Sequence, residues 1–165
     1  MKTLYLVRHA KSSWKYPSLS DEERPLNQRG KQNAPEMGIR LKKKGAVPDV
    51  LVSSHARRAL DTAKLMAEKL GYSKKKIIVD ERLYHASIAE FMEVIEEQDS
   101  KADVLMLFGH NPGLTGLANT LCQAHVENIV TAGVYAIRFD TDFWTEVPDM
   151  RGEFLFYYYP KKKQG

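Results

Sequence analysis

The sequence predicts an α/β fold with three layers, in which helices cover both faces of a mainly parallel sheet and an antiparallel pair forms one edge. Two observations lead to this prediction. Short apolar runs alternate with segments of helical period between residues 4 and 121, which is typical of βαβ units. Two apolar runs then follow each other after Gly133 without a helix between them, which indicates antiparallel neighbours.

Short apolar runs are the candidate strands of the parallel part. They cover residues 4–7, 49–52, 77–79 and 104–108. The runs are short enough for strands and end abruptly at polar residues, as expected of strands that are buried on both faces. Residues 134–139 and 153–159 complete the sheet as its antiparallel edge.

Helical periods fill the intervals between the early strands. Asn27 can cap a helix that continues to Leu41, and Pro35 inside it should kink the helix or move its start. The clearest helix spans residues 56–70, and Gly71 suits the position after its end.

Two later helices have recognisable starts. Residues 87–90 read Ser-Ile-Ala-Glu, which is a capping box. Asn111 can cap the last helix, with Pro112 at its first helical position. Residues 10–26 have no clear period and are expected to form a long loop.

Size and composition favour one globular domain. The chain has 165 residues, of which 43% are hydrophobic and 28% charged, so a disordered, collagen-like or disulfide-stapled protein is excluded. We assign residues 1–160 to a single domain and residues 161–165 to a basic tail. One cysteine cannot form an internal bridge and suggests a reducing compartment.

Hydropathy and charge indicate the location and the partners. No apolar run approaches the ~20 residues of a membrane span, and charge returns at Arg8, too early for a signal peptide. We therefore expect a cytoplasmic protein without membrane contact. The net charge is +4, and the lysine runs at 42–44, 74–76 and 161–163 are typical of solvated helix ends or tails. The sequence has no continuous basic stripe, so we do not expect nucleic-acid binding. The oligomeric state does not follow from the sequence.

Three candidate strands are followed by basic side chains at their carboxyl ends, where such sheets bind ligands. Arg8 and His9 leave the first strand, Arg57 and Arg58 begin the helix after the second, and His110 follows the fourth. Arginine forks match phosphate oxygens, and a histidine among them can attack phosphorus. Each feature alone is most often a surface residue or a turn, so the prediction of a phosphoryl-transfer site depends on their convergence.

Four segments carry a more specific resemblance. Residues 6–10 read Leu-Val-Arg-His-Ala, residues 24–30 read Arg-Pro-Leu-Asn-Gln-Arg-Gly, residues 54–63 read Ser-His-Ala-Arg-Arg-Ala-Leu-Asp-Thr-Ala, and residues 108–113 read Phe-Gly-His-Asn-Pro-Gly. In sequence order they resemble motifs of the histidine phosphatase superfamily, which includes phosphoglycerate mutases. The second segment resembles the small branch typified by the phosphohistidine phosphatase SixA. The resemblance implies a phosphoglycerate-mutase-like fold.

The resemblance also implies roles. His9 attacks phosphorus and is transiently phosphorylated, and water then attacks phospho-His9. Arg8, Arg58 and His110 hold the phosphoryl oxygens and stabilise the transition state; the alignment selects Arg58 rather than Arg57. A hydrogen bond from the other ring nitrogen of His9 to a backbone carbonyl would fix its tautomer, and a cationic His110 would help most. The chemistry needs no metal and no cofactor.

The sequence departs from the family pattern at several positions. Ala10 replaces the motif glycine, which an extended backbone tolerates and a left-handed one resists. Lys15 stands where mutase-type members have asparagine; it is either a phosphate contact or a solvated side chain. Arg24 is a further candidate for binding phosphate or substrate, by resemblance to the small branch.

The general acid is the least defined part of the site. Glu81 and His85 lie in the loop after the third strand, and either is a candidate proton donor or substrate contact. In phosphoglycerate mutases, an insertion carries the carboxylate that acts as general acid. The long insertion is missing here, which fits a small branch acting on phosphorus–nitrogen bonds.

The sequence therefore predicts a metal-independent phosphatase acting through phospho-His9, with protein phosphohistidine as its substrate. The alternative within enzymes is a small-molecule phosphomonoesterase, whose partner is a phosphorylated metabolite. An alternative of another class is a phosphate-binding or interaction module without turnover, which Ala10 and Lys15 would favour.

Overall fold

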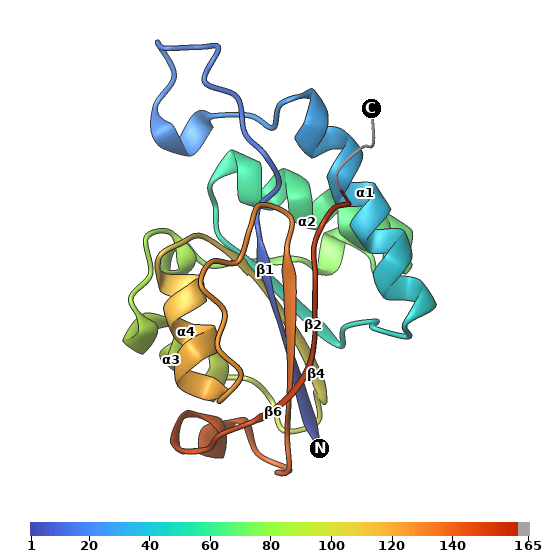
Figure 1. Cartoon of the computed structure of the whole chain (residues 1–165), viewed down its shortest axis with the longest axis vertical. Coiled ribbons are helices and arrows are strands. Elements are labelled where there is room, and N and C mark those ends of the chain that lie inside the picture. Colours follow the sequence, from blue (N-terminus) through green and yellow to red (C-terminus); the bar gives the residue numbers. More distant parts are fainter. Residues whose placement is uncertain (162–165) are drawn as a thin grey trace.

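The computed structural model describes residues 1–161, and the remainder of the expected basic tail, residues 162–165, lies outside the described residues. Six strands form one sheet in the order β3-β2-β4-β1-β5-β6, and Figure 1 shows this sheet between the helices. Their bounds are β1 Lys2–Arg8, β2 Val50–Ser53, β3 Ile78–Val79, β4 Val104–Gly109, β5 Val134–Phe139 and β6 Glu153–Tyr158. Parallel pairing joins β1 to β4, β4 to β2 and β2 to β3, whereas β5 is antiparallel to both β1 and β6. The predicted fold class, with its antiparallel edge, is confirmed.

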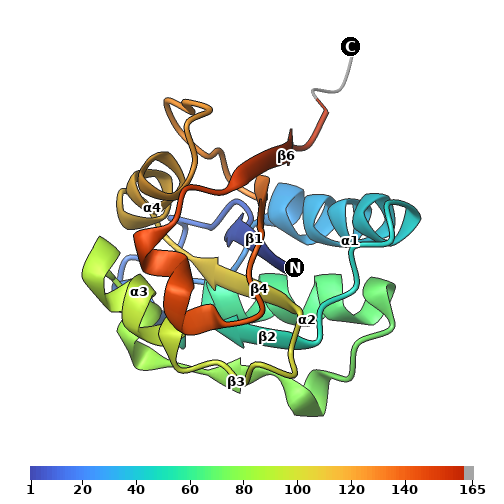
Figure 2. The ribbon, with the colours of Figure 1, turned by 90° about the horizontal axis from the view of Figure 1, so that it is seen from below.

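Helices cover both faces of the sheet, as Figure 2 shows. On one face lie α1 (Gln28–Lys43) and α2 (Arg57–Leu70), and on the other α3 (Ile88–Glu96) and α4 (Gly113–Leu121). Side chains alternate along the buried strands, so β1 and β4 contribute to two separate cores. Leu4 and Leu6 of β1 pack on the α3–α4 side, whereas Tyr5 and Val7 pack on the α1–α2 side.

The sequence located the helix starts within two residues. The Asn27 side chain accepts a hydrogen bond from the Gly30 amide, and α1 runs unbroken through Pro35, which did not move the start. The capping box of α3 is present. The last helix was expected to begin at Pro112, but α4 begins one residue later, at Gly113. The Asn111 side chain nevertheless accepts a hydrogen bond from the Thr115 amide at 3.2 Å.

The structure bears on the expected location at two points. Within residues 1–161, no helix combines the length and the apolar character that crossing a membrane requires. Cys122 is buried and unpaired. The cytoplasmic location stays a prediction.

The loop after β1 is anchored on the first turn of α1. The Asn27 amide donates to the Lys11 carbonyl oxygen at 3.0 Å. A side chain at Gly30 would overlap that same oxygen, which is backbone and cannot move aside independently. The glycine of the segment at residues 24–30 is therefore needed for this close approach.

We expect Gly30→Ala to lower the free energy of unfolding by about 1–3 kcal/mol, because the added methyl group displaces the loop that carries the site. Gly116→Ala in α4 is the matched control. Its methyl group would meet only the flexible end of Ile88, and alanine favours the helix. Urea denaturation measures both variants, and equal stability of the two would contradict the argument.

Candidate active site

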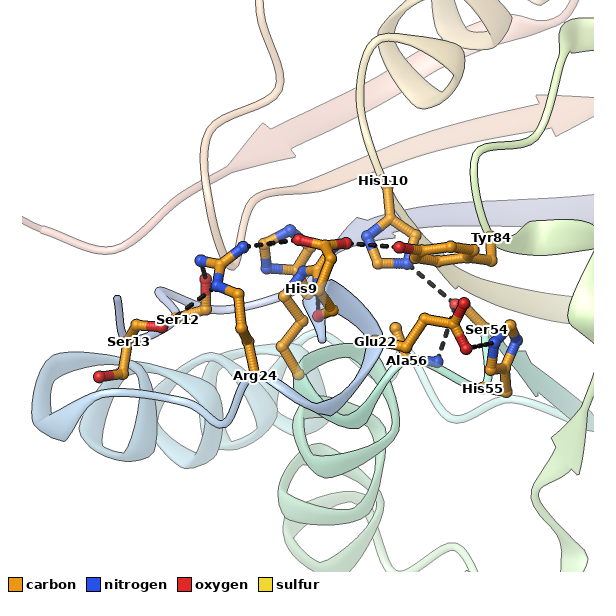
Figure 3. Close-up of polar contacts among 12 residues, drawn as sticks. His9, Ser12, Ser13, Glu22, Arg24, Ser54, His55, Ala56, Tyr84 and His110 are labelled. Atoms are coloured by element: carbon orange, nitrogen blue, oxygen red, sulfur yellow. Dashed lines mark hydrogen bonds and ion pairs between the residues drawn. The ribbon is translucent and has the colours of Figure 1, made fainter. Parts of the chain in front are cut away.

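The site lies at the carboxyl ends of three neighbouring strands. Arg8 ends β1 opposite Gly109 of β4, so His9 and His110 leave adjacent strands at the same level. Their ring centroids are 5.1 Å apart. Ser54 follows β2, the other neighbour of β4. Figure 3 shows these side chains converging, and His9 lines a hollow of about 450 Å³.

His9 is held in one tautomer. His9 is 8% exposed, and its Nδ1 lies 2.7 Å from the Ala10 carbonyl oxygen. Because a carbonyl oxygen only accepts, Nδ1 carries the proton and Nε2 keeps a free lone pair. Ala10 itself does not have a positive φ, so the methyl group that replaces the motif glycine causes no backbone strain. The Ala10 amide donates to the Thr62 hydroxyl of α2 at 2.9 Å, which fixes the position of this turn.

His110 has a different set of partners. Its Nε2 lies 2.9 Å from the Ser54 hydroxyl, which already accepts from the Ala56 amide at 3.2 Å. Since the hydroxyl hydrogen needs an acceptor, Ser54 donates to Nε2, and the proton of neutral His110 sits on Nδ1. This Nδ1 is buried and has no partner within the described residues. A buried donor without a partner is costly, so this N–H is a candidate contact for a ligand bound beside His9.

Burial lowers the pKa of both histidines. The pKa of His9 falls to about 4, and burial is the largest cause. The hydrogen bond to Ala10 raises the pKa, whereas the positive charges of the arginines around the site lower it further. The pKa of His110 falls to about 3, again through burial first and then through His9 and Arg58. Both imidazoles are thus neutral at pH 7, whereas the sequence argument expected a cationic His110. A bound phosphoryl dianion would offset the positive charge of the arginines and so favour the protonated form.

Three arginines border the site. Arg58 is 5% exposed and Arg24 is 8% exposed, whereas Arg8 is half-buried. The Nη1 of Arg8 donates to the Ile129 carbonyl at 3.1 Å, and its buried Nε has no partner within the described residues. Arg57 points to solvent and pairs with Asp61, so the alignment's choice of Arg58 agrees with the geometry.

Asp21 joins two of these arginines and was not predicted. Its carboxylate accepts from Arg58 Nη2 and from Arg24 Nη1, both at 2.9 Å, and from the Tyr84 hydroxyl. Its carbonyl oxygen accepts from Arg58 Nη1 at 2.6 Å. Burial alone would raise the pKa of Asp21, but the hydrogen bonds from Tyr84, Arg58 and Arg24 outweigh it and hold the pKa below its usual range.

Aromatic rings complete the wall beside Asp21. The Tyr84 ring meets the His110 ring edge-on, with centroids 5.4 Å apart. The guanidinium of Arg24 lies 3.3 Å from the ring centroid of Trp14, which is 79% exposed at the mouth of the hollow. Arg24 is therefore fixed on one side by Asp21 and on the other by an aromatic face.

The remaining candidates lie at differing distances from the histidines. His85 is exposed, and its ring centroid is 6.5 Å from that of His110, so it lies at the edge of the site. Glu81 is exposed, and within residues 1–161 its carboxylate makes no hydrogen bond or ion pair. Lys15 lines an adjoining hollow instead of the one that contains His9, which disagrees with a contact to the transferred phosphoryl group.

The charges add up to a site for an anion. Arg8, Lys11, Arg24 and Arg58 line the hollow, and with the Asp21 carboxylate they leave a net charge of +3 while both imidazoles are neutral. A phosphoryl group carries up to two negative charges, which this positive charge can balance. Among the described residues, no group of three or more His, Cys, Asp or Glu side chains is placed to hold a metal ion.

A sheet edge with this charge and two buried imidazoles defines a phosphoryl-transfer protein. Residues 4–113, more than half of the chain, match the family described as the histidine phosphatase superfamily (branch 1). The chain belongs to this superfamily, and the predicted membership is confirmed.

Curated relatives support the family. A protein of Arabidopsis thaliana, described as uncharacterized and chloroplastic, is 31% identical over 134 residues, which cover 76% of this chain and 62% of the relative. The 2,3-bisphosphoglycerate-dependent phosphoglycerate mutase of Parvibaculum lavamentivorans is 38% identical over 82 residues, or 48% of this chain and 39% of the enzyme. The chain thus spans less than two thirds of the length of these relatives.

Solved structures share the whole fold. SixA of Agrobacterium tumefaciens superposes with a TM-score of 0.82 at 23% identity, covering 97% of this chain and 99% of that one. A protein histidine phosphatase SixA complexed with tungstate gives 0.77 at 18% identity, covering 95% and 96%. At these identities the likeness concerns the fold.

We expect His9 and His110 to stay neutral down to about pH 5, because both pKa values lie well below the usual ~6.5. Imidazole resonances recorded by NMR in phosphate-free buffer, and assigned with His9→Ala and His110→Ala, measure this directly. A titration step near pH 6.5 at either ring would contradict the burial argument.

The ion pairs of Asp21 predict a pH-dependent stability. The pKa of Asp21 in the folded protein lies below the unfolded value of ~3.9, so its contribution is complete above that pH and is lost as the pH falls. We expect Asp21→Asn to have a lower Tm than the wild type at neutral pH, with a difference that shrinks below about pH 4. A Tm difference independent of pH would assign the loss to packing instead of charge.

Proposed function

We propose that this protein is a phosphatase that acts through a phosphohistidine at His9 without a metal ion, and that its substrate is phosphohistidine in a protein. The observation that carries the proposal is the fixed tautomer of His9. Nδ1 of His9 donates its proton in a hydrogen bond to the Ala10 carbonyl oxygen. The lone pair on Nε2 is therefore the nucleophile, in a hollow bordered by three arginines.

The reaction has two displacement steps. In the first, Nε2 of His9 forms a bond to phosphorus while the bond between phosphorus and the substrate's ring nitrogen breaks; that nitrogen takes a proton from solvent and leaves as histidine. In the second, water attacks phospho-His9, the N–P bond breaks, one proton of the water returns to solvent, and inorganic phosphate leaves. Phosphohistidine and water thus become histidine and phosphate, and His9 is restored.

The other side chains stabilise charge on the phosphoryl oxygens. Arg8, Arg24 and Arg58 supply guanidinium N–H groups. Asp21 uses two of the five on Arg58, and the other three have no partner within residues 1–161. The unpartnered Nδ1–H of His110 is a further donor. Because these groups are already in place, they need little reorganisation as charge develops.

The state of the carboxylates favours a phosphorus–nitrogen bond over an alkyl ester. Asp21 is held ionised by Arg58, Arg24 and Tyr84, so it is a poor proton donor at neutral pH. The carboxylate of the exposed Glu81 makes no hydrogen bond or ion pair within residues 1–161. An alkoxide needs a general acid in order to leave, whereas the imidazole of phosphohistidine needs less help. The fold shared with SixA structures supports the same substrate class.

We expect His9→Ala to lower kcat/KM about a thousandfold or more on an aryl phosphate and on a phosphohistidine peptide, because the nucleophile is removed. His125→Ala, an exposed histidine outside the site, is the matched control and should retain activity. EDTA should leave the wild type unchanged. Acid-labile phosphate trapped on the wild type, and absent from His9→Ala, would identify the intermediate.

Three results would overturn parts of this proposal. Full activity of His9→Ala would exclude the nucleophile, and loss of activity in EDTA would exclude metal independence. Alkyl phosphates turned over as fast as the phosphohistidine peptide would favour the small-molecule phosphomonoesterase.

A further inference from the structure

A second hollow adjoins the catalytic one. Its volume is about 510 Å³, and Ser13 and Asn27 line both hollows, so the two are neighbours on the same face. Three cationic side chains line it, and no carboxylate does: the cations are Lys15, Lys31 and Arg57. The proposed chemistry at His9 uses none of them.

These cations come from three different parts of the chain. Lys15 belongs to the loop after β1, Lys31 to the first turns of α1, and Arg57 to the first turn of α2. Lys15 and Lys31 form no ion pair within residues 1–161, and Arg57 has only an exposed contact with Asp61 at 3.6 Å. Because exposed pairs of this kind are weak, all three charges remain available to a ligand.

The position of Lys31 is unfavourable for the helix. The N-terminus of α1 carries the positive end of the helix dipole, which disfavours nearby cations. Yet the first turn of α1 has no acidic residue, and Arg29 and Lys31 lie at this end. Helix stability therefore does not explain a cation here, and an anion bound at this end would be favoured by both the lysine and the helix dipole.

We propose that this hollow is a second anion subsite, which binds a carboxylate or phosphate group of the same substrate whose phosphoryl group lies beside His9. The inference rests on the proposed phosphatase function and extends it to substrate selection. In a phosphoprotein the group is an Asp or Glu side chain near the phosphohistidine, and in a metabolite it is a second phosphate. Lys15 then contacts a part of the substrate other than the transferred phosphoryl group.

The test compares matched substrates. One pair is two phosphohistidine peptides that differ only in carrying Glu or Gln beside the phosphohistidine, and the other is a sugar bisphosphate and the corresponding monophosphate. We expect the wild type to favour the more anionic member of one pair about fivefold to tenfold in kcat/KM, as two weak ion pairs would give. Preference within the peptide pair identifies a protein source, and preference within the sugar pair identifies a metabolite.

The double variant Lys15→Ala/Lys31→Ala should bring this ratio close to one. Lys101→Ala, at the opposite end of the sheet just before β4, removes an exposed lysine without touching either hollow and should keep the wild-type ratio. The preference should also shrink as salt rises, because exposed charges are screened. A wild-type ratio near one for both pairs, or an unchanged ratio in the double variant, would overturn the subsite.

Binding separates this inference from the proposed function. His9→Ala keeps the subsite residues, so calorimetry with the two peptides measures recognition without turnover. The subsite is supported if His9→Ala binds the Glu peptide more tightly than the Gln peptide and this difference is lost when Lys15→Ala and Lys31→Ala are combined with His9→Ala. This result counts even if the wild type hydrolyses no phosphohistidine. Equal affinity for both peptides, together with equal affinity for the sugar bisphosphate and the monophosphate, overturns it even if hydrolysis is fast.

Discussion

The paired hydrogen bonds between Arg58 and Asp21 are the interaction on which the site depends. Arg58 is nearly buried in α2, and Asp21 lies in the long loop after β1. Their contact holds the loop against the helix, and the same carboxylate orients Arg24 and the Tyr84 ring beside His110. A guanidinium buried without a partner would carry a large desolvation cost. Asp21 offsets that cost and still leaves the site with the positive charge that a phosphoryl group needs.

The two histidines show how neighbours of the same residue type acquire different tasks. A carbonyl acceptor at Nδ1 makes His9 a nucleophile at Nε2, whereas a hydroxyl donor at Nε2 makes His110 a hydrogen-bond donor at Nδ1. Their pKa values fall together because both rings are buried among cations. Tautomer therefore distinguishes their roles in the free protein, and charge can distinguish them only after an anion arrives.

The sequence was sufficient to predict the features that depend on strand ends and short motifs. Alternating apolar runs and helical periods located the sheet, and the carboxyl-end rule was enough to place Arg8, His9 and His110 at one edge of it. Asp21 was missed because its partners are distant in sequence: 37 residues separate it from Arg58 and 63 from Tyr84. No periodicity describes the loop that carries it. The sequence left the role of Lys15 open between a phosphate contact and a solvated side chain for the same reason, since its position depends on how that loop folds over α1.

Charge balance connects the loop to substrate choice. The four cations that line the catalytic hollow and the Asp21 carboxylate leave a net charge of +3, most of which a phosphoryl dianion would neutralise. An additional anionic group would then gain more from the adjoining hollow, where Lys15 and Lys31 form no ion pair within residues 1–161. The loop at residues 10–26 contributes to both hollows. The fold of this loop therefore sets the phosphoryl site and the neighbouring charge together, so that a change in one is expected to alter the other.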